Sequence, residues 1–246
     1  MTFTVLAWNL QRLVRHASRY VDVYTIIETY RPDVMFLSEV SHDLEFAGYR
    51  EVGHALSLNA SKVMGKKVTF NQLSTKLLVR VTAINVKVTA RAVREGGENQ
   101  PRLMIKANIN HNLKNYIFRF VHSKASQRSA AEAVSVIKTI MKHEENSVVM
   151  GDMNLGIEKP AAFATAEAFG QKVVEMNNSF GTPVASTHSA GKKFDWACAT
   201  ADLPIVAVSE KADTMRFRRQ RAIGKRRGLS PEIPLSDHRP IIYQIG

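Results

Sequence analysis

The sequence has 246 residues, of which 45% are hydrophobic and 23% charged, ordinary values for a globular chain that can bury a sizeable core. It has no apolar run long enough to span a bilayer, and its one cysteine, Cys198, excludes an internal disulfide. Lys and Arg number 34 and Asp and Glu number 22, so the formal net charge of +12 favours an anionic partner such as nucleic acid, an anionic membrane or a phosphorylated substrate.

The chain opens with a pattern that predicts a strand, a helix and a second strand. Residues 3–8 and 33–38 are apolar and strand-like, and Arg31-Pro32 ends the helix predicted between them at 17–30. One face of that helix is expected to carry Ala17, Tyr20, Val21, Tyr24 and Ile27. No charged region precedes the first strand, so we expect no signal peptide and, with a single cysteine, a cytoplasmic location.

The rest of the chain continues the mixture of strands and helices. Residues 62–121 are rich in β-branched side chains and predict successive strands joined by turns. Further on, helices are predicted at 126–143 and 160–169, and strands at 147–150, 194–199, 204–209 and 239–245. We therefore expect sheets covered by helices, an α/β layered fold, in a single domain spanning 1–246.

Several apolar strands end on a polar residue that packing does not require. These residues are Asn9, Glu39, His122, Asp152 with Asn154 in "GDMN", Asp195 in "FDW", and Asp237 with His238 in "SDH". Singly, each has a structural explanation, because an Asn after a strand is usually a turn former, "SDH" can cap a helix, and Glu39 can be a solvated loop residue. Together they can line one cleft and supply oxygen ligands for Mg²⁺, a general base and donors for a phosphate.

In this order, these residues resemble the endonuclease/exonuclease/phosphatase superfamily. The match runs from residue 5 to residue 245, and "GDMN" and "SDH" are its most specific parts. The resemblance implies a four-layered α/β sandwich, in which two central mixed β-sheets are flanked by helices and the active site lies at one edge. It also implies divalent-metal-dependent hydrolysis of a phosphoester.

The resemblance also assigns a metal site and a phosphate contact. Glu39 corresponds to the principal ligand of Mg²⁺, for which Mn²⁺ is a possible substitute, and Asn9 and Asp237 are its neighbours in the metal shell. Thr187, in "STHSAGKKFDW", occupies the place of a threonine that contacts the substrate phosphate.

The same resemblance assigns the residues that move protons and hold the phosphate. His238 corresponds to the general base and Asp195 to the carboxylate that orients it. Asp152 and Asn154 would position the water and the scissile phosphate, and His122 would donate to a phosphate oxygen or to the leaving group. These roles agree with physical expectation, because an Asp keeps a His in one tautomer and fixed donors stabilise a transition state without reorganising.

Three departures narrow the choice within the superfamily. In the deoxyribonuclease branch a Glu of the middle strands supports the first histidine, but residues 52–94 contain no Asp or Glu, so the partner of His122 is unidentified. Trp196 stands where inositol phosphatases usually have an Arg, which disfavours that branch. Abasic-site enzymes generally lack a histidine at the position of His122, which disfavours that branch too.

Two basic segments favour nucleic acid as the partner, DNA in particular. The acid-free window 52–94 contains Lys62, Lys66, Lys67, Lys76, Arg80, Lys87, Arg91 and Arg94. The segment 215–228, just upstream of "SDH", contains Arg216, Arg218, Arg219, Arg221, Lys225, Arg226 and Arg227. A loop of this kind beside the cleft would hold a phosphate backbone with little sequence preference. The alternative for the loop is a mobile basic segment or a localisation signal.

Three hypotheses follow. The first is a Mg²⁺-dependent nuclease, a low-specificity endonuclease that cleaves DNA by in-line attack of water. The second keeps this chemistry on a phosphoinositide, sphingomyelin or another small phosphoester. The third is a nucleic-acid-binding module without catalysis. DNA or RNA, endonuclease or exonuclease, the number of metal ions and the oligomeric state are left open by the sequence.

Overall fold

The structure is a computed structural model of the 246-residue chain. It describes residues 2–13, 20–57, 61–63, 66–68, 73–83, 85–93, 104–122, 145–154, 170–178, 180, 182–184, 186–187, 194–209, 216–217, 233–234, 236 and 238–246. The predicted helices at 126–143 and 160–169 lie outside these residues.

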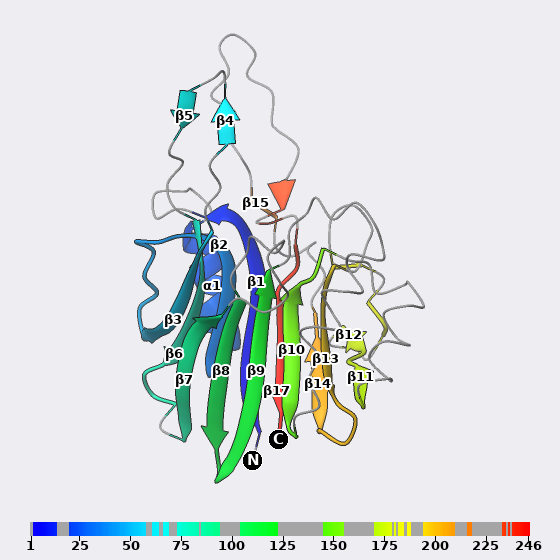
Figure 1. The fold of residues 1–246 in the computed structure, drawn as a ribbon. Helices are drawn as coiled ribbons and strands as arrows, with labels where there is room; N and C mark the ends of the chain where they lie inside the picture. The colour runs from blue at the N-terminus through cyan, green and yellow to red at the C-terminus, as the bar shows by residue number, and fades with distance from the viewer. Residues whose placement is uncertain are drawn as a thin grey trace.

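Two mixed sheets pack face to face in the described part of the chain (Figure 1). The seven-stranded sheet has the order β12-β14-β17-β1-β2-β6-β3. Its strands are β12 (Met176–Asn177), β14 (Ile205–Val208), β17 (Ile241–Ile245), β1 (Phe3–Leu13), β2 (Val34–Ser41), β6 (Leu73–Arg80) and β3 (Tyr49–Ser57). In this sheet β1 and β2 are parallel, whereas β1 and β17 are antiparallel.

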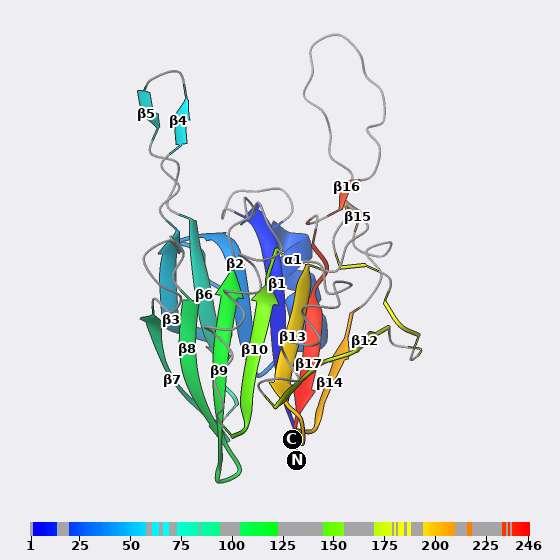
Figure 2. The same cartoon turned by 45° about the vertical axis from the view of Figure 1, so that its right-hand side comes forward.

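The six-stranded sheet has the order β11-β13-β10-β9-β8-β7. Its strands are β11 (Gln171–Val173), β13 (Asp195–Thr200), β10 (Ser147–Asp152), β9 (Lys114–His122), β8 (Met104–His111) and β7 (Val86–Val93). Two small antiparallel pairs, β4 (Ser61–Val63) with β5 (Lys66–Val68) and β15 (Arg216–Phe217) with β16 (Ile233–Pro234), lie beyond the end of the sheets that is opposite the two termini (Figures 1 and 2).

Alternation along β1 explains how the layers form. Phe3, Val5 and Ala7 belong to the core between the two sheets, whereas Leu6 and Trp8 belong to the core under helix α1 (Tyr20–Tyr30). Successive side chains of a strand point to opposite faces, so a strand that is apolar on both faces needs a cover on each. The two-sheet core and one helical cover are therefore observed, and α1 is the one helix in the described ranges.

The face that α1 buries differs from the one predicted. Val21 is 67% exposed, whereas Val23 and Ile27 are fully buried. Val23 and Ile27 lie four residues apart on the stripe that faces Leu6 and Trp8, and Val21 lies across the helix from that stripe. The prediction placed Val21 on the wrong face because a short helix with several apolar residues allows more than one stripe.

Strand β3 was not predicted from the sequence. Its residues Tyr49–Ser57 include the charged Arg50 and Glu51, and the alternation is broken by an irregular register against β6 between Glu51 and Gly53. β3 lies at the edge of the seven-stranded sheet, so solvent reaches its polar side chains. Among the described residues, no helix is long and apolar enough to cross a membrane.

Part of the acid-free basic window is structural. Lys76 is 3% exposed, and its ammonium group forms an ion pair with Glu51 at 2.8 Å and donates to the carbonyl oxygen of Leu44 at 2.9 Å. Arg80 forms an ion pair with Asp33. These two cations of β6 therefore neutralise acidic residues that lie outside the window in sequence, and they are not placed to bind nucleic acid.

The Glu51–Lys76 pair predicts a pH-dependent contribution to stability. Burial acts to raise the pKa of Glu51, but the hydrogen bonds and charges of Lys76 and His54 lower it overall. A lowered pKa means that ionised Glu51 stabilises the fold at neutral pH, and that this contribution disappears as the pH falls below the ordinary value of 4.5. Because Glu51 is half exposed, we expect Glu51→Gln to lower the free energy of unfolding by about 1 kcal/mol at neutral pH.

The measurement is urea unfolding of both proteins at neutral pH and at a pH below the carboxyl titration. Glu45→Gln, at an exposed loop position, is the matched control. A stability difference between wild type and Glu51→Gln that does not shrink at the acidic pH contradicts this assignment.

Candidate active site

One rung of the six-stranded sheet carries three of the predicted site residues. Asp152 of β10 pairs with His122 of the parallel neighbour β9 and with Asp195 of the antiparallel neighbour β13. Directly paired residues point to the same face of a sheet, so the three side chains lie side by side. Upstream on that face, β9 presents Phe118 and Phe120, which belong to the buried core between the sheets. The rung formed by these three polar residues therefore lies at the edge of the core between the two sheets.

The seven-stranded sheet contributes Asn9 and Glu39 at bulges. The pairing of β1 with β2 shifts register between Asn9 and Leu13, and the pairing of β2 with β6 shifts between Leu37 and Val40. Gln11 and Glu39 have left-handed backbones, with φ of 45° and 56°, which ordinary side chains rarely adopt. Such bulges redirect side chains at strand ends, and non-glycine residues in this conformation are concentrated at functional sites.

Asp152 is the centre of the arrangement. Its side chain is 3% exposed, Oδ2 accepts a hydrogen bond from Asn9 Nδ2 at 3.0 Å, and Oδ1 accepts one from the Asn154 backbone N–H at 2.9 Å. The Nε2 atoms of His122 and His238 both lie 3.7 Å from the same Oδ2. Asp152 thus links the two sheets and lies between the two histidines.

His238 and Asp195 form a buried pair. His238 Nδ1 lies 2.7 Å from Asp195 Oδ2, a hydrogen bond that leaves Nε2 on the side of Asp152. Burial raises the pKa of Asp195 to about 7, with the nearby Asp152 carboxylate adding to the rise and the hydrogen bond from His238 opposing it. A carboxylate in this position holds the imidazole in one tautomer and orientation.

His122 has acidic neighbours after all. Its Nε2 lies 3.5 Å from Glu39 Oε1 and 3.7 Å from Asp152 Oδ2. The sequence window 52–94 could not supply them, because both carboxylates come from other strands: Glu39 from β2 and Asp152 from β10. The acidic neighbours of His122 therefore come from strands of both sheets and not from the sequence window 52–94.

Two residues that the sequence interpretation did not assign hold His238 in place. Ser236 Oγ donates to the carbonyl oxygen of Asn9 at 2.6 Å and accepts from the His238 backbone N–H at 3.1 Å. Trp8 Nε1 donates to the carbonyl oxygen of His238 at 3.0 Å. The only signal in the sequence was the proximity of these residues to motifs, Ser236 in "SDH" and Trp8 next to Asn9.

Thr187 lies behind Asp195. It is fully buried, and its Oγ1 accepts a hydrogen bond from the Asp195 backbone N–H at 3.0 Å. Its carbonyl oxygen accepts from the Arg239 backbone N–H at 2.8 Å, next to His238 in sequence. In this arrangement Thr187 positions the Asp195–His238 pair, and its predicted contact with a phosphate stays a prediction.

The remaining predicted residues are only partly described. Asp237 lies outside the described residues, as do the side chain of Arg216 and all of Arg218, Arg219, Arg221, Lys225, Arg226 and Arg227. The backbone of Arg216 pairs with Pro234, and Phe217 pairs with Ile233. The two flanks of the basic segment are therefore joined just before Ser236 and His238.

The donor set suits a hard cation. Oxygens of Asp152 and Asp195 and a nitrogen of His238 all lie within 4.8 Å of one another, so these three could hold an ion. Asp195 Oδ2 and His238 Nδ1 already contact each other at 2.7 Å. The Glu39 side chain is 23% exposed and lies beside His122, so its carboxylate can be reached from solvent. Carboxylate and amide oxygens are the ligands that Mg²⁺ prefers, and buried carboxylates of like charge need a compensating cation.

Gly151 allows the rung to form. Its φ is +130°, and a Cβ atom at this position would lie 2.1 Å from the carbonyl oxygen of Val121 and 2.9 Å from Cε1 of Phe36. Val121 is on the neighbouring strand β9 and Phe36 is on β2 of the other sheet. Only glycine fits this close approach, which places Asp152 level with His122.

Comparison with solved structures establishes the fold. An endonuclease/exonuclease/phosphatase family protein from Bacteroides thetaiotaomicron superposes with a TM-score of 0.66 at 13% identity, covering 100% of this chain and 97% of that chain. The mannosyl-6-phosphatase of Bacteroides thetaiotaomicron VPI-5482 gives 0.65 at 13% identity, with 99% of each chain covered. Zebrafish (D. rerio) TDP2 complexed with a single-strand DNA product gives 0.62 at 14% identity, covering 100% and 99%.

These identities are low, so the likeness concerns the fold. The resemblance inferred from "GDMN" and "SDH" is confirmed at that level, because the whole chain superposes on proteins of this superfamily. No family model matches the sequence, and no curated protein does either.

Because the backbone at Gly151 lies so close to Val121, a methyl group added at Gly151 should strongly destabilise the fold. We expect Gly151→Ala to lower the free energy of unfolding by about 3 kcal/mol or more, from the clash with Val121 and from the left-handed backbone. Gly48→Ala is the matched control, because Gly48 has φ of +78° but nothing within 4 Å of an added Cβ. It should cost only about 1 kcal/mol. Urea unfolding measures the free energy of unfolding of both variants. Equal losses of this free energy in Gly151→Ala and Gly48→Ala would contradict the importance of the close contact at Gly151.

Ser236 predicts a positioning effect on catalysis. Ser236→Ala leaves the Asn9 carbonyl and the His238 N–H without this partner, which should cost about 1–3 kcal/mol of stability. It should also lower kcat for phosphoester hydrolysis without raising KM, because His238 loses an anchor and substrate contacts are kept.

Ser209→Ala is the control for this variant. Ser209 Oγ is buried and has no hydrogen-bond partner among the described residues, so its removal should be neutral or stabilising. An unchanged kcat in folded Ser236→Ala would refute the positioning role.

Proposed function

We propose that this chain, which has the endonuclease/exonuclease/phosphatase fold, is a metal-dependent phosphoesterase that hydrolyses phosphodiester bonds in nucleic acid, as a low-specificity endonuclease on DNA. The observation that carries the proposal is the Asp195–His238 pair, in which Nε2 of His238 lies 3.7 Å from Oδ2 of Asp152, on the same rung as His122. An oriented general base beside a second imidazole and a set of oxygen ligands is what hydrolysis of an anionic ester needs.

His238 is proposed as the general base. Its Nδ1 is held by Asp195, which fixes the tautomer in which Nε2 would take the proton of an attacking water. Asp152 and Asn154 would hold that water and the phosphate in line, because Asp152 is fixed by two hydrogen bonds and needs no reorganisation.

His122 is proposed to donate to a phosphate oxygen or to the leaving oxygen. Its Nε2 lies 3.5 Å from a Glu39 oxygen and 3.7 Å from an Asp152 oxygen, so this nitrogen faces the part of the site where the phosphate would lie. The two histidines thereby have different environments: one is held by a buried Asp at Nδ1, and the other meets carboxylates at Nε2.

Glu39, Asn9 and Asp237 are proposed to hold Mg²⁺, with Mn²⁺ as a substitute. Asn9 Oδ1 accepts from the Gln11 backbone N–H and keeps a second lone pair. When bound, the ion would offset the negative charge that develops on the phosphate in the transition state.

The basic segment favours a polymeric substrate. The backbone pairing of β15 with β16 brings the start of this segment next to Ile233–Pro234, four to five residues before His238, and the sequence from Arg216 to Arg227 contains seven cations. Arginine-rich segments hold phosphate backbones without reading the bases, which agrees with low sequence specificity. TDP2 bound to a single-strand DNA product shares the fold, which supports nucleic acid as the substrate class.

A small phosphoester is the second candidate. The mannosyl-6-phosphatase superposes as well as the other neighbours do, so the fold does not discriminate between the two substrate classes. A phosphoinositide, sphingomyelin or a sugar phosphate would then take the place of the nucleic-acid strand at the same residues, with the basic segment holding a headgroup or an anionic membrane.

Plasmid nicking tests the function. Wild type should convert supercoiled plasmid to open circles with Mg²⁺ or Mn²⁺, and EDTA should abolish this reversibly. His238→Ala should be inactive, and Asp195→Asn should lose on the order of 10³–10⁴ in kcat, because the imidazole tautomer is no longer held. His54→Ala, at a half-exposed histidine away from the rung, is the control.

The same preparations should be tested for phosphate release and headgroup cleavage on a small-ester panel. Turnover of a small ester with plasmid left intact would move the assignment to the second candidate. No turnover on any phosphoester by folded wild type would reject both and leave a nucleic-acid-binding module.

A further inference from the structure

Three non-glycine residues with left-handed backbones lie at the strand ends that form the site. Gln11, Glu39 and Asn154 have φ of 45°, 56° and 49°, in the last residues of β1 and β2 and just after β10. The other described residues of this kind lie at the end of α1 or in turns next to strands: Arg31, Asn112, Leu113 and Asn146. Turns often require this conformation, whereas a side chain held in it at a site is commonly functional. Glu39 and Asn154 have proposed roles, and Gln11 has none.

Gln11 lies in a bulge of β1. Asn9 pairs with Ser38 and Leu13 pairs with Val40, so β1 takes four residue steps where β2 takes two. Leu13 is fully buried, whereas Gln11 is exposed. The extra length of β1 therefore lifts Gln11 out of the regular strand and toward solvent.

The Asn9 side chain connects Gln11 to the rung. Its Oδ1 accepts a hydrogen bond from the Gln11 backbone N–H at 3.0 Å, and its Nδ2 donates to Asp152 Oδ2 at 3.0 Å. Asn9 is buried, so its carboxamide is packed between these two partners. Gln11 therefore lies one side chain away from Asp152, at the solvent-facing rim of the site.

A neutral carboxamide at this rim suits a substrate phosphate. The side chain of Gln11 carries two N–H donors and no charge, so it can donate to a phosphate oxygen without being drawn to the carboxylates of the site, as a cation would be. The residues proposed to contact the scissile phosphate, His122 and Asn154, belong to β9 and to the chain just after β10, in the other sheet. A contact from Gln11 therefore falls on a neighbouring group of the substrate.

We propose that Gln11 is a substrate-binding residue whose side-chain amide donates to the phosphate next to the scissile one in a nucleic-acid strand. The inference rests on the proposed function in that the substrate is a nucleic acid. The competing explanation is that the bulge serves only to place Asn9. In that case glycine, which adopts a left-handed backbone without strain, would serve at position 11 as well as glutamine does.

The test compares two substrates. The value of kcat/KM is measured with Mg²⁺ for a duplex oligonucleotide and for bis(p-nitrophenyl) phosphate, which has no neighbouring phosphate. The ratio of the two values should fall about 10-fold in Gln11→Gly, as expected for the loss of one hydrogen bond to a charged group. An unchanged ratio, whether both values fall or neither does, would overturn the proposal.

Urea unfolding checks the backbone argument. Gln11→Gly should not lower the urea midpoint, because relief of the left-handed strain offsets the greater freedom of glycine in the unfolded chain. A midpoint below that of wild type would contradict the strain on which the inference rests.

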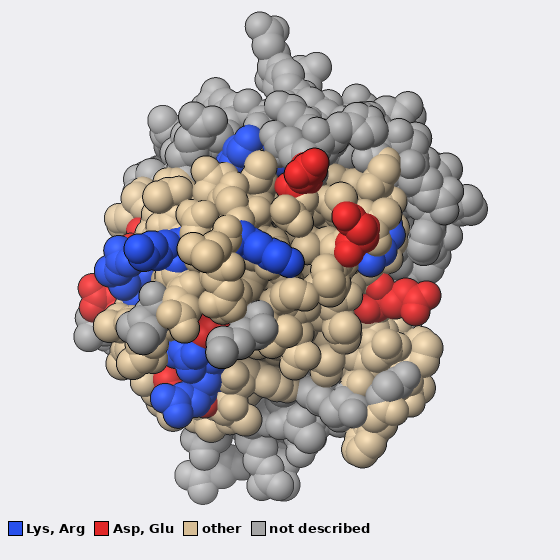
Figure 3. Space-filling view, turned by 90° about the horizontal axis from the view of Figure 1, so that it is seen from below, with Lys and Arg blue, Asp and Glu red and all other residues tan. Residues whose placement is uncertain are grey.

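Leu113→Gly is the control for the backbone. Leu113 has φ of 65° and is fully exposed in the turn between β8 and β9, whereas His122 lies at the other end of β9 (Figure 1). Figure 3, which views the end of the molecule that carries this turn, shows both basic and acidic side chains on it. Leu113→Gly should not lower the urea midpoint either, and it should leave the substrate ratio at the wild-type value.

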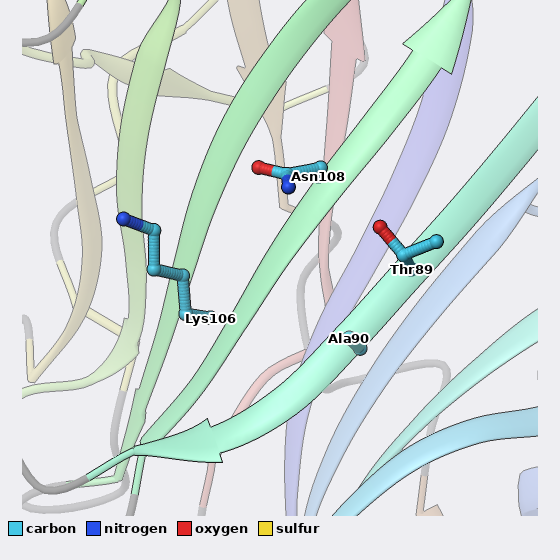
Figure 4. A pocket seen from close by; sticks show the side chains of 4 residues that line it. All are labelled: Thr89, Ala90, Lys106 and Asn108. Carbon is cyan, nitrogen blue, oxygen red and sulfur yellow. The ribbon is translucent and has the colours of Figure 1, made fainter.

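Asn108→Ala is the control for the carboxamide. Asn108 is exposed on β8 and lines a shallow hollow with Thr89, Ala90 and Lys106 (Figure 4). Because β9 separates β8 from β10, this variant removes an exposed amide two strands away from the centre of the rung. The substrate ratio should equal that of wild type. A fall as large as that in Gln11→Gly would show that the position of the amide does not matter and would overturn the proposal.

Binding in EDTA separates this inference from the proposed function. Fluorescence anisotropy of the labelled duplex should show several-fold weaker binding by Gln11→Gly than by wild type and the two controls. If wild type binds the duplex but hydrolyses no phosphoester, the function is rejected, and weaker binding by Gln11→Gly still supports the binding role. Cleavage of DNA by wild type with unchanged binding and ratio in Gln11→Gly would reject the binding role alone. Wild type that neither binds nor cleaves DNA would reject both.

Discussion

The fixed position of one buried carboxylate, that of Asp152, is the constraint on which the rest of the site depends. Its two oxygens are held by Asn9 from the other sheet and by the Asn154 backbone, and both histidines lie 3.7 Å from Oδ2. The carboxylate reaches this position because β10 runs parallel to β9 and antiparallel to β13 in one register, and because Gly151 lets the chain pass close to Val121. A shift of one residue in β10 would turn Asp152 to the opposite face and separate it from both histidines.

Placing carboxylates and imidazoles at the edge of an apolar core has an electrostatic cost. The raised pKa of Asp195 expresses that cost, since burial disfavours its ionised form and Asp152 adds repulsion. The left-handed backbones of Glu39, Gln11 and Asn154 add local strain. Rigid strands below the rung, packed through rings such as Phe36 and Phe120 at a centroid distance of 4.8 Å, hold these unfavourable features in place. A bound cation would relieve the repulsion, so the burial of these carboxylates close together favours metal binding.

The net charge of +12 is divided among different roles. Lys76 and Arg80 neutralise Glu51 and Asp33 inside the fold and leave no positive charge for a ligand. The basic segment begins at β15, whose backbone pairs with β16 just before Ser236 and His238. A basic composition therefore indicates an anionic partner only after the paired cations have been set aside.

The sequence by itself determined where most strands lie, because strands depend on local periodicity. It also determined which polar residues end those strands and the resemblance carried by "GDMN" and "SDH", because these depend on residue type. It predicted the residues that converge on the rung, including the His238–Asp195 pair, but it could not supply acidic neighbours for His122 or the anchoring role of Ser236. It also placed Val21 on the buried side of α1 and missed β3. Those features were decided by tertiary structure alone, because they depend on which strands become neighbours. Glu39 and His122 are 83 positions apart in sequence, and only the packing of two sheets brings their side chains within 3.5 Å.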